Sequence, residues 1–183
     1  MRCRSARPSE RGASAVEFAL VAPLLFGLLF GIVDYGLYFA DVVTVQQGLG
    51  AAARTATLAP SSASGPQWGT ATCQLQQDTG GGGGQLEHLA CSVLQGVDPV
   101  AGQLFVRAEL VDETGEPTRI WATGSRLRLC GLTDHPPVLP FVPLPSGGRI
   151  HTRVDMPVQA VPNQVLMAAV QSPPPAGSNW SWC

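Results

Sequence analysis

The feature that constrains this chain most is an uncharged apolar run close to its N-terminus. Residues 18–33 contain no charged side chain, and the run is bounded by Glu17 and Asp34. At about 1.5 Å per residue, a helix over residues 13–40 is long enough to cross a hydrocarbon core of roughly 30 Å. The sequence therefore predicts a membrane anchor, with a secretory signal peptide and a buried core helix as alternatives.

Charge around the run indicates an orientation in the cell membrane. The first twelve residues contain four arginines and one glutamate, whereas acids outnumber arginines in the rest of the chain. Basic residues before a single span favour a cytoplasmic N-terminus and an extracytoplasmic head. Helical spacing continues past the run to Leu58, and Pro60 should end the helix. The residues that keep this spacing are Tyr35, Phe39, Val42, Val43, Leu49, Ala52, Ala53 and Ala56.

Composition excludes several function classes. The chain has 183 residues, of which 13% are charged, and it contains no lysine, so P-loop and Schiff-base lysines are excluded. A net charge of -2 gives no indication of nucleic-acid binding. His88 and Cys91 form an i, i+3 pair without further ligands at metal-site spacing, and no nucleophile motif is present. We expect no enzyme activity, no cofactor and no metal.

The start of the apolar run carries a recognisable signal. A basic leader ends at Gly12, with Glu17 five residues later, Phe18 beside it and Pro23 farther on. This order is similar to the class III signal of type IV pilin-like proteins. The resemblance implies that a prepilin peptidase cuts between Gly12 and Ala13. It also implies that Glu17 pairs with the free ammonium of a neighbouring subunit, whereas the residues alone allow a carboxylate that caps the helix N-terminus.

A longer string narrows the resemblance to one family. The motif continues with Gly-Ile-Val-Asp-Tyr-Gly over residues 31–36 and Ala-Ala-Ala-Arg over residues 51–54. Over about residues 11–58 the chain resembles the TadE-like family, pseudopilins of the tight-adherence (Flp) pilus apparatus. The partners implied are the prepilin peptidase, other pilin-like subunits, the assembly platform and membrane lipid.

Other residues of the helix have expected roles. Pro23 should kink or loosen the helix, because it removes one backbone hydrogen bond. Gly27 and Gly31 lie one turn apart and permit close helix packing in lipid, although glycine is also common in membrane helices. We expect Asp34 and Asp41 to be solvated where the helix leaves the membrane, rather than to form a catalytic pair.

The pattern predicts an α+β protein with a long N-terminal helix and a small head. In the head, a helix over residues 85–95 should pack on an antiparallel sheet of three or four short strands. Strand patterns cover residues 103–112, 118–122, 126–130, 149–156 and 158–161. The expected segments are a leader (1–12), a helix (13–58), a Gly/Ser-rich linker (59–84), the head (85–171) and a Pro-rich tail (172–183).

Cysteine usage predicts disulfides in the head. Cys3 falls in the leader, which leaves an even number of cysteines outside it, and these allow three connectivities in an oxidising compartment. We favour one bridge from the linker to the short helix and one from the sheet to the tail, with free buried thiols as the alternative. The favoured pairs are Cys73–Cys91 and Cys130–Cys183.

Three functions are compatible with the sequence. The first is a pseudopilin-like subunit that supports pilus assembly through helix–helix packing. The second is a membrane-anchored extracytoplasmic binding module unrelated to pili, and the third, the least favoured, is an anchored hydrolase.

Overall fold

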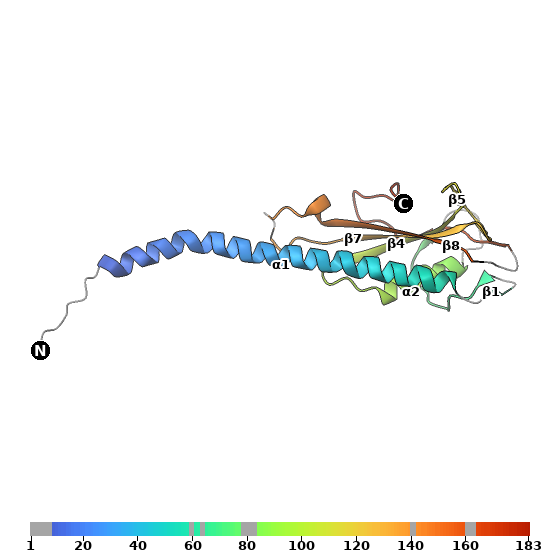
Figure 1. Ribbon diagram of the computed structural model, residues 1–183, viewed down its shortest axis with the longest axis horizontal. Coiled ribbons are helices and arrows are strands. Elements are labelled where there is room, and N and C mark those ends of the chain that lie inside the picture. Colours follow the sequence, from blue (N-terminus) through green and yellow to red (C-terminus); the bar gives the residue numbers. More distant parts are fainter. Residues whose placement is uncertain (1–8, 59–60, 63–64, 78–83, 140–141, 160–163) are drawn as a thin grey trace, which may run out of the picture.

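A computed structural model describes residues 9–58, 61–62, 65–77, 84–139, 142–159 and 164–183. Its dominant element is the helix α1 (Ser9–Thr57), which extends well beyond a smaller head at its C-terminal half (Figure 1). A second helix, α2 (Gly84–Gly96), lies beside the C-terminal half of α1. The α+β fold expected from the sequence is confirmed.

The head is built on one antiparallel sheet with the strand order β3-β10-β4-β7-β8, and β5 pairs with β4. Its three longest strands have nine residues each, so the sheet is larger than the three or four short strands expected. These strands are β4 (Gln103–Val111), β7 (Arg126–Asp134) and β8 (Arg149–Pro157). The short strands are β3 (Gln76–Gln77), β5 (Pro117–Thr118) and β10 (Val170–Gln171), besides the pairs β1 (Ser61–Ser62) with β2 (Gly65–Pro66) and β6 (Ile120–Trp121) with β9 (Val165–Leu166).

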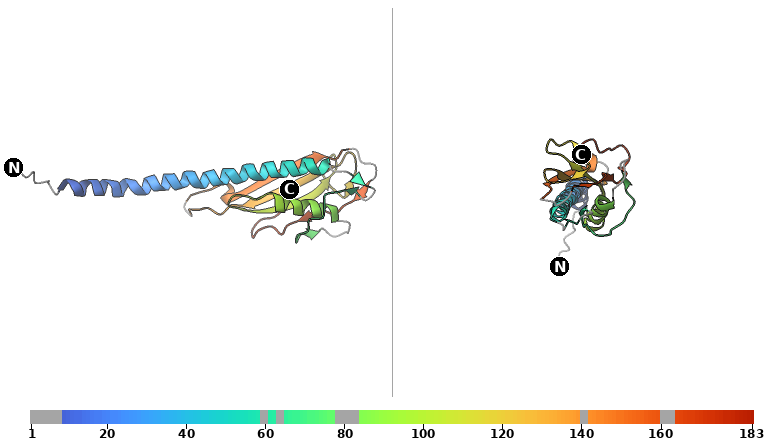
Figure 2. Two further views of the ribbon diagram at one scale, coloured as in Figure 1. Left: turned by 90° about the horizontal axis from the view of Figure 1, so that it is seen from below. Right: turned by 90° about the vertical axis from the view of Figure 1, so that its right-hand side faces the viewer.

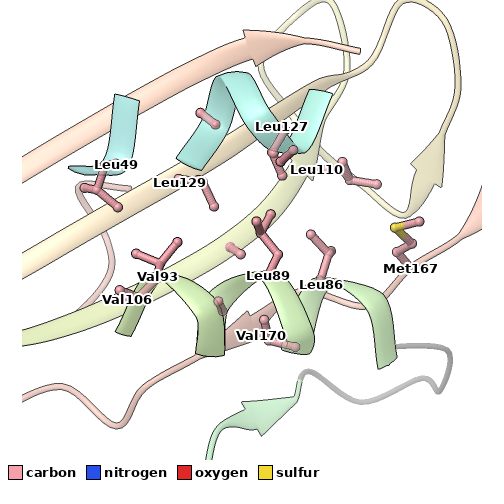
Figure 3. Close-up of a cluster of buried hydrophobic side chains, with 14 of the residues drawn as sticks. Leu49, Leu86, Leu89, Val93, Val106, Leu110, Leu127, Leu129, Met167 and Val170 are labelled. Carbon is pink, nitrogen blue, oxygen red and sulfur yellow. The ribbon is translucent and has the colours of Figure 1, made fainter. Parts of the chain in front are cut away.

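Both helices cover the same face of the sheet (Figure 2). The helix α1 packs on β7 and β8, and α2 packs on β4 and β10. Figure 3 shows side chains from the two helices and the sheet meeting in one apolar core. Gly131 permits the close approach of α1, because a Cβ at this position would lie only 2.6 Å from Cδ1 of Leu49.

Part of the segment expected as a linker packs against the head. The indole Nε1 of Trp68 donates to the carbonyl of Ala56, 2.9 Å away, and its ring makes an edge contact with Trp121. Cys73 is also bonded to Cys91 of α2. The glycine run lies mainly in residues 78–83, outside the described residues.

The opposite face of the sheet carries a row of ion pairs across the three long strands. Glu109 of β4 lies 2.7 Å from Arg107 and 3.2 Å from Arg128 of β7. Arg128 also lies 3.1 Å from Asp155 of β8, which pairs with Arg153 at 2.8 Å. Burial raises the pKa of Asp155, but hydrogen bonds from Arg153 and Arg128 and their charges outweigh burial, so the pKa lies below its ordinary value.

This lowered pKa predicts a loss of stability in acid. Above the ordinary carboxylate pKa, Asp155 is ionised in both states and its ion pairs stabilise the fold in full. As the pH falls below about 4, the unfolded chain takes up the proton first, and the contribution disappears once the pH passes the folded pKa. The urea midpoint should therefore fall less between pH 7 and pH 3 in Asp155→Asn than in the wild type.

The control for this prediction is the exposed Asp98, whose change to Asn removes the same charge without touching the ion-pair row. Asp98→Asn should follow the wild-type pH profile. Parallel profiles for Asp155→Asn and the wild type would show that the Asp155 pairs contribute nothing to acid sensitivity.

Candidate functional site: the exposed helix and its junction with the head

The N-terminal half of α1 is uncovered by the rest of the described chain. No side chain in residues 14–33 is buried, although most of them are apolar. This twenty-residue stretch measures about 30 Å along the helix axis, the thickness of a hydrocarbon core. Among the described residues, α1 is the one helix whose length and composition suit a membrane span.

The site residues expected from the sequence lie on this exposed half. Glu17 is exposed near its start, and α1 continues through Pro23. Gly27 and Gly31 face open space: beyond the neighbouring residues and backbone of the helix itself, no atom lies within 4 Å of a Cβ at either position. Gly12 and Ala13 belong to α1, which begins at Ser9, but their exposure lies outside what the structure describes.

After residue 33 the helix packs against the head through one stripe of buried residues. Its members recur every three or four residues, so they lie on one face of the helix. The first half of this stripe differs from the face predicted from the sequence, because Tyr35 and Phe39 lie off it and two aspartates lie on it. The stripe consists of Asp34, Tyr38, Asp41, Val45, Leu49, Ala53 and Ala56.

Asp41 joins the helix to two distant parts of the chain. Its carboxylate is fully buried and accepts hydrogen bonds from the backbone N–H groups of Val100, Ala101 and Gly102. Its Oδ2 also lies 2.7 Å from Nδ1 of His135. One side chain therefore holds the loop before β4 and the end of β7 against α1.

Asp34 holds a second loop about two helical turns closer to the exposed half. Its fully buried carboxylate accepts from the N–H groups of Val138 at 3.1 Å and Leu139 at 3.4 Å. The Nε2 atom of His135 lies 3.9 Å from Oδ1 of Asp34, so the imidazole stands between the two carboxylates. The prediction that Asp34 and Asp41 are solvated is wrong: both are buried and satisfied by backbone donors.

A signal for this cluster was present in the sequence. Asp34 and Asp41 are seven residues apart, and Val45 and Leu49 continue the same face toward the C-terminus. His135 carried no such signal, because it gains its partners only when β7 returns to α1. The cluster is built to fasten a helix rather than to hold a substrate, since its carboxylate oxygens are taken by the chain's own donors.

The two disulfides have the pairing that the sequence analysis favours. Cys73 is bonded to Cys91 across 18 residues, and Cys130 to Cys183 across 53 residues. By the loop-entropy argument each stabilises the head by about 2–4 kcal/mol. Because Cys91 is consumed in a bridge, the considered metal pair of His88 and Cys91 does not form; Nδ1 of His88 instead lies 2.7 Å from the carbonyl of Ala71.

A groove of about 770 Å³ runs between α1 and α2. Small and apolar residues form most of its wall, including Ala52 and Val93, and Arg54 is the only charged residue among those that line it. A wall of this kind offers surface for packing and no acid–base pair for catalysis.

Comparison with known protein families finds a match that lies in the helix α1. The model of the family described as TadE-like protein matches residues 12–57. No curated protein and no solved structure matches the chain. The matched segment runs from the proposed processing site to the C-terminal residue of α1, so it contains Glu17 together with both buried aspartates. The resemblance found in the sequence is therefore confirmed over residues 12–57, the segment of this chain that is similar to TadE-like proteins.

Proposed function

We propose that this protein is a pseudopilin-like subunit that supports assembly of a tight-adherence pilus. One observation carries the proposal: the TadE-like segment contains residues 14–33 of α1, none of which is buried by the rest of the described chain. An apolar surface of this length is unfavourable in water and has to be met by lipid or by other apolar helices. A subunit that moves from a membrane into a helix bundle would use both.

The charged residue within residues 14–33 supports the same function. Glu17 lies near the start of the exposed apolar stretch, where an ionised side chain is costly unless a partner compensates it. Within the described residues, no cation lies in ion-pair contact with Glu17. An ammonium on a neighbouring subunit would compensate the charge and set the register of the two helices.

The rigid junction suits a subunit of this kind. Asp34 and Asp41 fasten α1 to the head through loops that follow α2 and β7. The head is therefore carried in a fixed orientation at the end of the exposed helix. A prepilin peptidase, pilin-like subunits and the assembly platform are the proposed partners, with the head on the extracytoplasmic side.

Processing provides the test of this function. A glutamate in place of Gly12 puts a bulky charge at the proposed scissile bond, so Gly12→Glu should leave the full-length protein uncut in the membrane. N-terminal sequencing of the wild type, expressed with a prepilin peptidase, should find Ala13 first. Gel migration and mass spectrometry of both forms measure the loss of residues 1–12.

A matched control adds the same charge elsewhere. Gln46 is an exposed residue of α1 within the head, and Gln46→Glu should be processed normally. A wild-type cut near residue 34 or 40 would instead favour a secretory signal peptide. An uncut wild type in the presence of the peptidase would favour an anchored binding module unrelated to pili.

A further inference from the structure

The segment between β7 and β8 has an unusual composition for a surface loop. Residues 136–148 contain five prolines and no charged side chain. Val138 is 56% exposed, and Leu139, Val142 and Leu144 are partly exposed. A solvated loop is normally polar, so this apolar composition indicates that the loop contacts an apolar surface or medium.

This loop lies at the level where the exposed half of α1 ends. Its Val138 and Leu139 are bound to Asp34, the first buried residue after residues 14–33. The hydroxyl of Tyr35 donates to the carbonyl of Pro143, 2.6 Å away. In Figure 1 the loop is at the end of the head from which the N-terminal half of α1 emerges.

The backbone of the loop is also suited to a medium without water. Prolines have no N–H to satisfy, and the N–H groups of Val138 and Leu139 are taken by Asp34. The N–H of Val142 donates to Leu139 and that of His135 to Gly148, which closes the base of the loop. Gly148 has a φ of +85°, and a Cβ there would meet the carbonyl oxygen of His135, so the closure depends on glycine. Unsatisfied donors would be costly in the apolar part of a bilayer.

We propose that this loop, through Val138 and the described residues around it, dips into the interface of the membrane that α1 spans. The inference rests on the proposed membrane anchoring of α1 and adds a second contact of the head with lipid. If residues 14–33 fill the hydrocarbon core, residues 34 and 35 lie at its border, and the loop bound to them reaches the headgroup and acyl boundary. Tyr35 has the amphipathic ring that is enriched at this depth.

A second contact would fix the tilt of the head. A single helix leaves the head free to tilt and rotate above the bilayer. A loop held by Asp34 and seated in the interface removes that freedom, and so presents the sheet and the groove between α1 and α2 in one orientation to neighbouring subunits.

Depth-dependent quenching tests the proposal on the full chain. Single cysteines at Val138, Leu24 and Leu166, each in a Cys3→Ser background, are labelled with an environment-sensitive fluorophore in phosphatidylethanolamine/phosphatidylglycerol vesicles. The three side chains are all well exposed, at 56%, 73% and 68%, so the substitutions should not disturb the fold. Lipids spin-labelled near the headgroup or deep in the acyl chain serve as quenchers.

Each labelled position has a distinct expected result. Leu24 should be quenched most by the deep lipid, and Leu166, on β9, by neither lipid. Val138 should show a blue-shifted emission and be quenched most by the shallow lipid.

A quenched Leu24 with an unquenched Val138 would overturn the loop proposal and leave the anchor intact, whereas an unquenched Leu24 would overturn the anchor itself. A blue shift at Val138 without quenching, growing with the protein-to-lipid ratio, would assign the loop to a contact between copies and also overturn the proposal.

Discussion

Asp41→Ala should destabilise the protein by about 3–5 kcal/mol, because it removes one partner of a buried charged cluster. The substitution leaves the N–H groups of Val100, Ala101 and Gly102 and the fully buried imidazole of His135 without the carboxylate that they contact. Such a loss is a large share of the roughly 5–15 kcal/mol that keeps a domain folded. For a chain of this size it corresponds to roughly 6–20 °C in Tm.

Thermal unfolding in detergent, followed by near-ultraviolet circular dichroism, measures this effect. Asp41→Asn keeps an acceptor oxygen at the site and should recover part of the loss. Asp98→Ala removes an exposed carboxylate and should change Tm little. If Asp41→Ala melts within a degree of Asp98→Ala, the junction contributes no stability and α1 is held by its apolar stripe alone.

The elements with local signals could be predicted from the sequence. The alternation predicted over residues 103–112 and 149–156 corresponds to β4 and β8, and the apolar face of residues 85–95 corresponds to α2. The helix boundary at residue 57 follows from Ala59-Pro60, since a proline disfavours helix in the residue before it. In each case the residues that determine the helix, strand or helix end lie within or beside that element.

The junction depends on contacts that no local pattern contains. Asp34 and Asp41 are charged, and a hydrophobicity pattern assigns charged residues to the solvent face. They are buried because their acceptors meet backbone donors 59–61 and 104–105 residues away. The disulfide pairing also joins distant residues, but it could be predicted, because few cysteines allow few connectivities.

The second large effect is expected at the other end of the helix. Glu17→Leu should insert into the membrane at least as well as the wild type, because an apolar side chain is cheaper there than a carboxylate. Assembly should nevertheless fail if Glu17 pairs with the ammonium of a neighbouring subunit. Removing one charge of a desolvated pair leaves the other uncompensated, at roughly 3–5 kcal/mol, which lowers an association constant by about two to three orders of magnitude.

Co-purification with the pilus machinery and a count of surface pili measure this loss, and the structure supplies the controls. Val21 is an exposed apolar residue one turn from Glu17, so Val21→Leu changes the same lipid-facing surface without removing a charge. Glu17→Asp keeps the charge on a shorter side chain and should retain part of the assembly. Both Glu17 variants should be inserted and cut after Gly12, which separates a failure of pairing from a failure of processing. Normal piliation in Glu17→Leu would show that the carboxylate has no partner in the assembled state, and α1 would then be an anchor whose only requirement is apolar length.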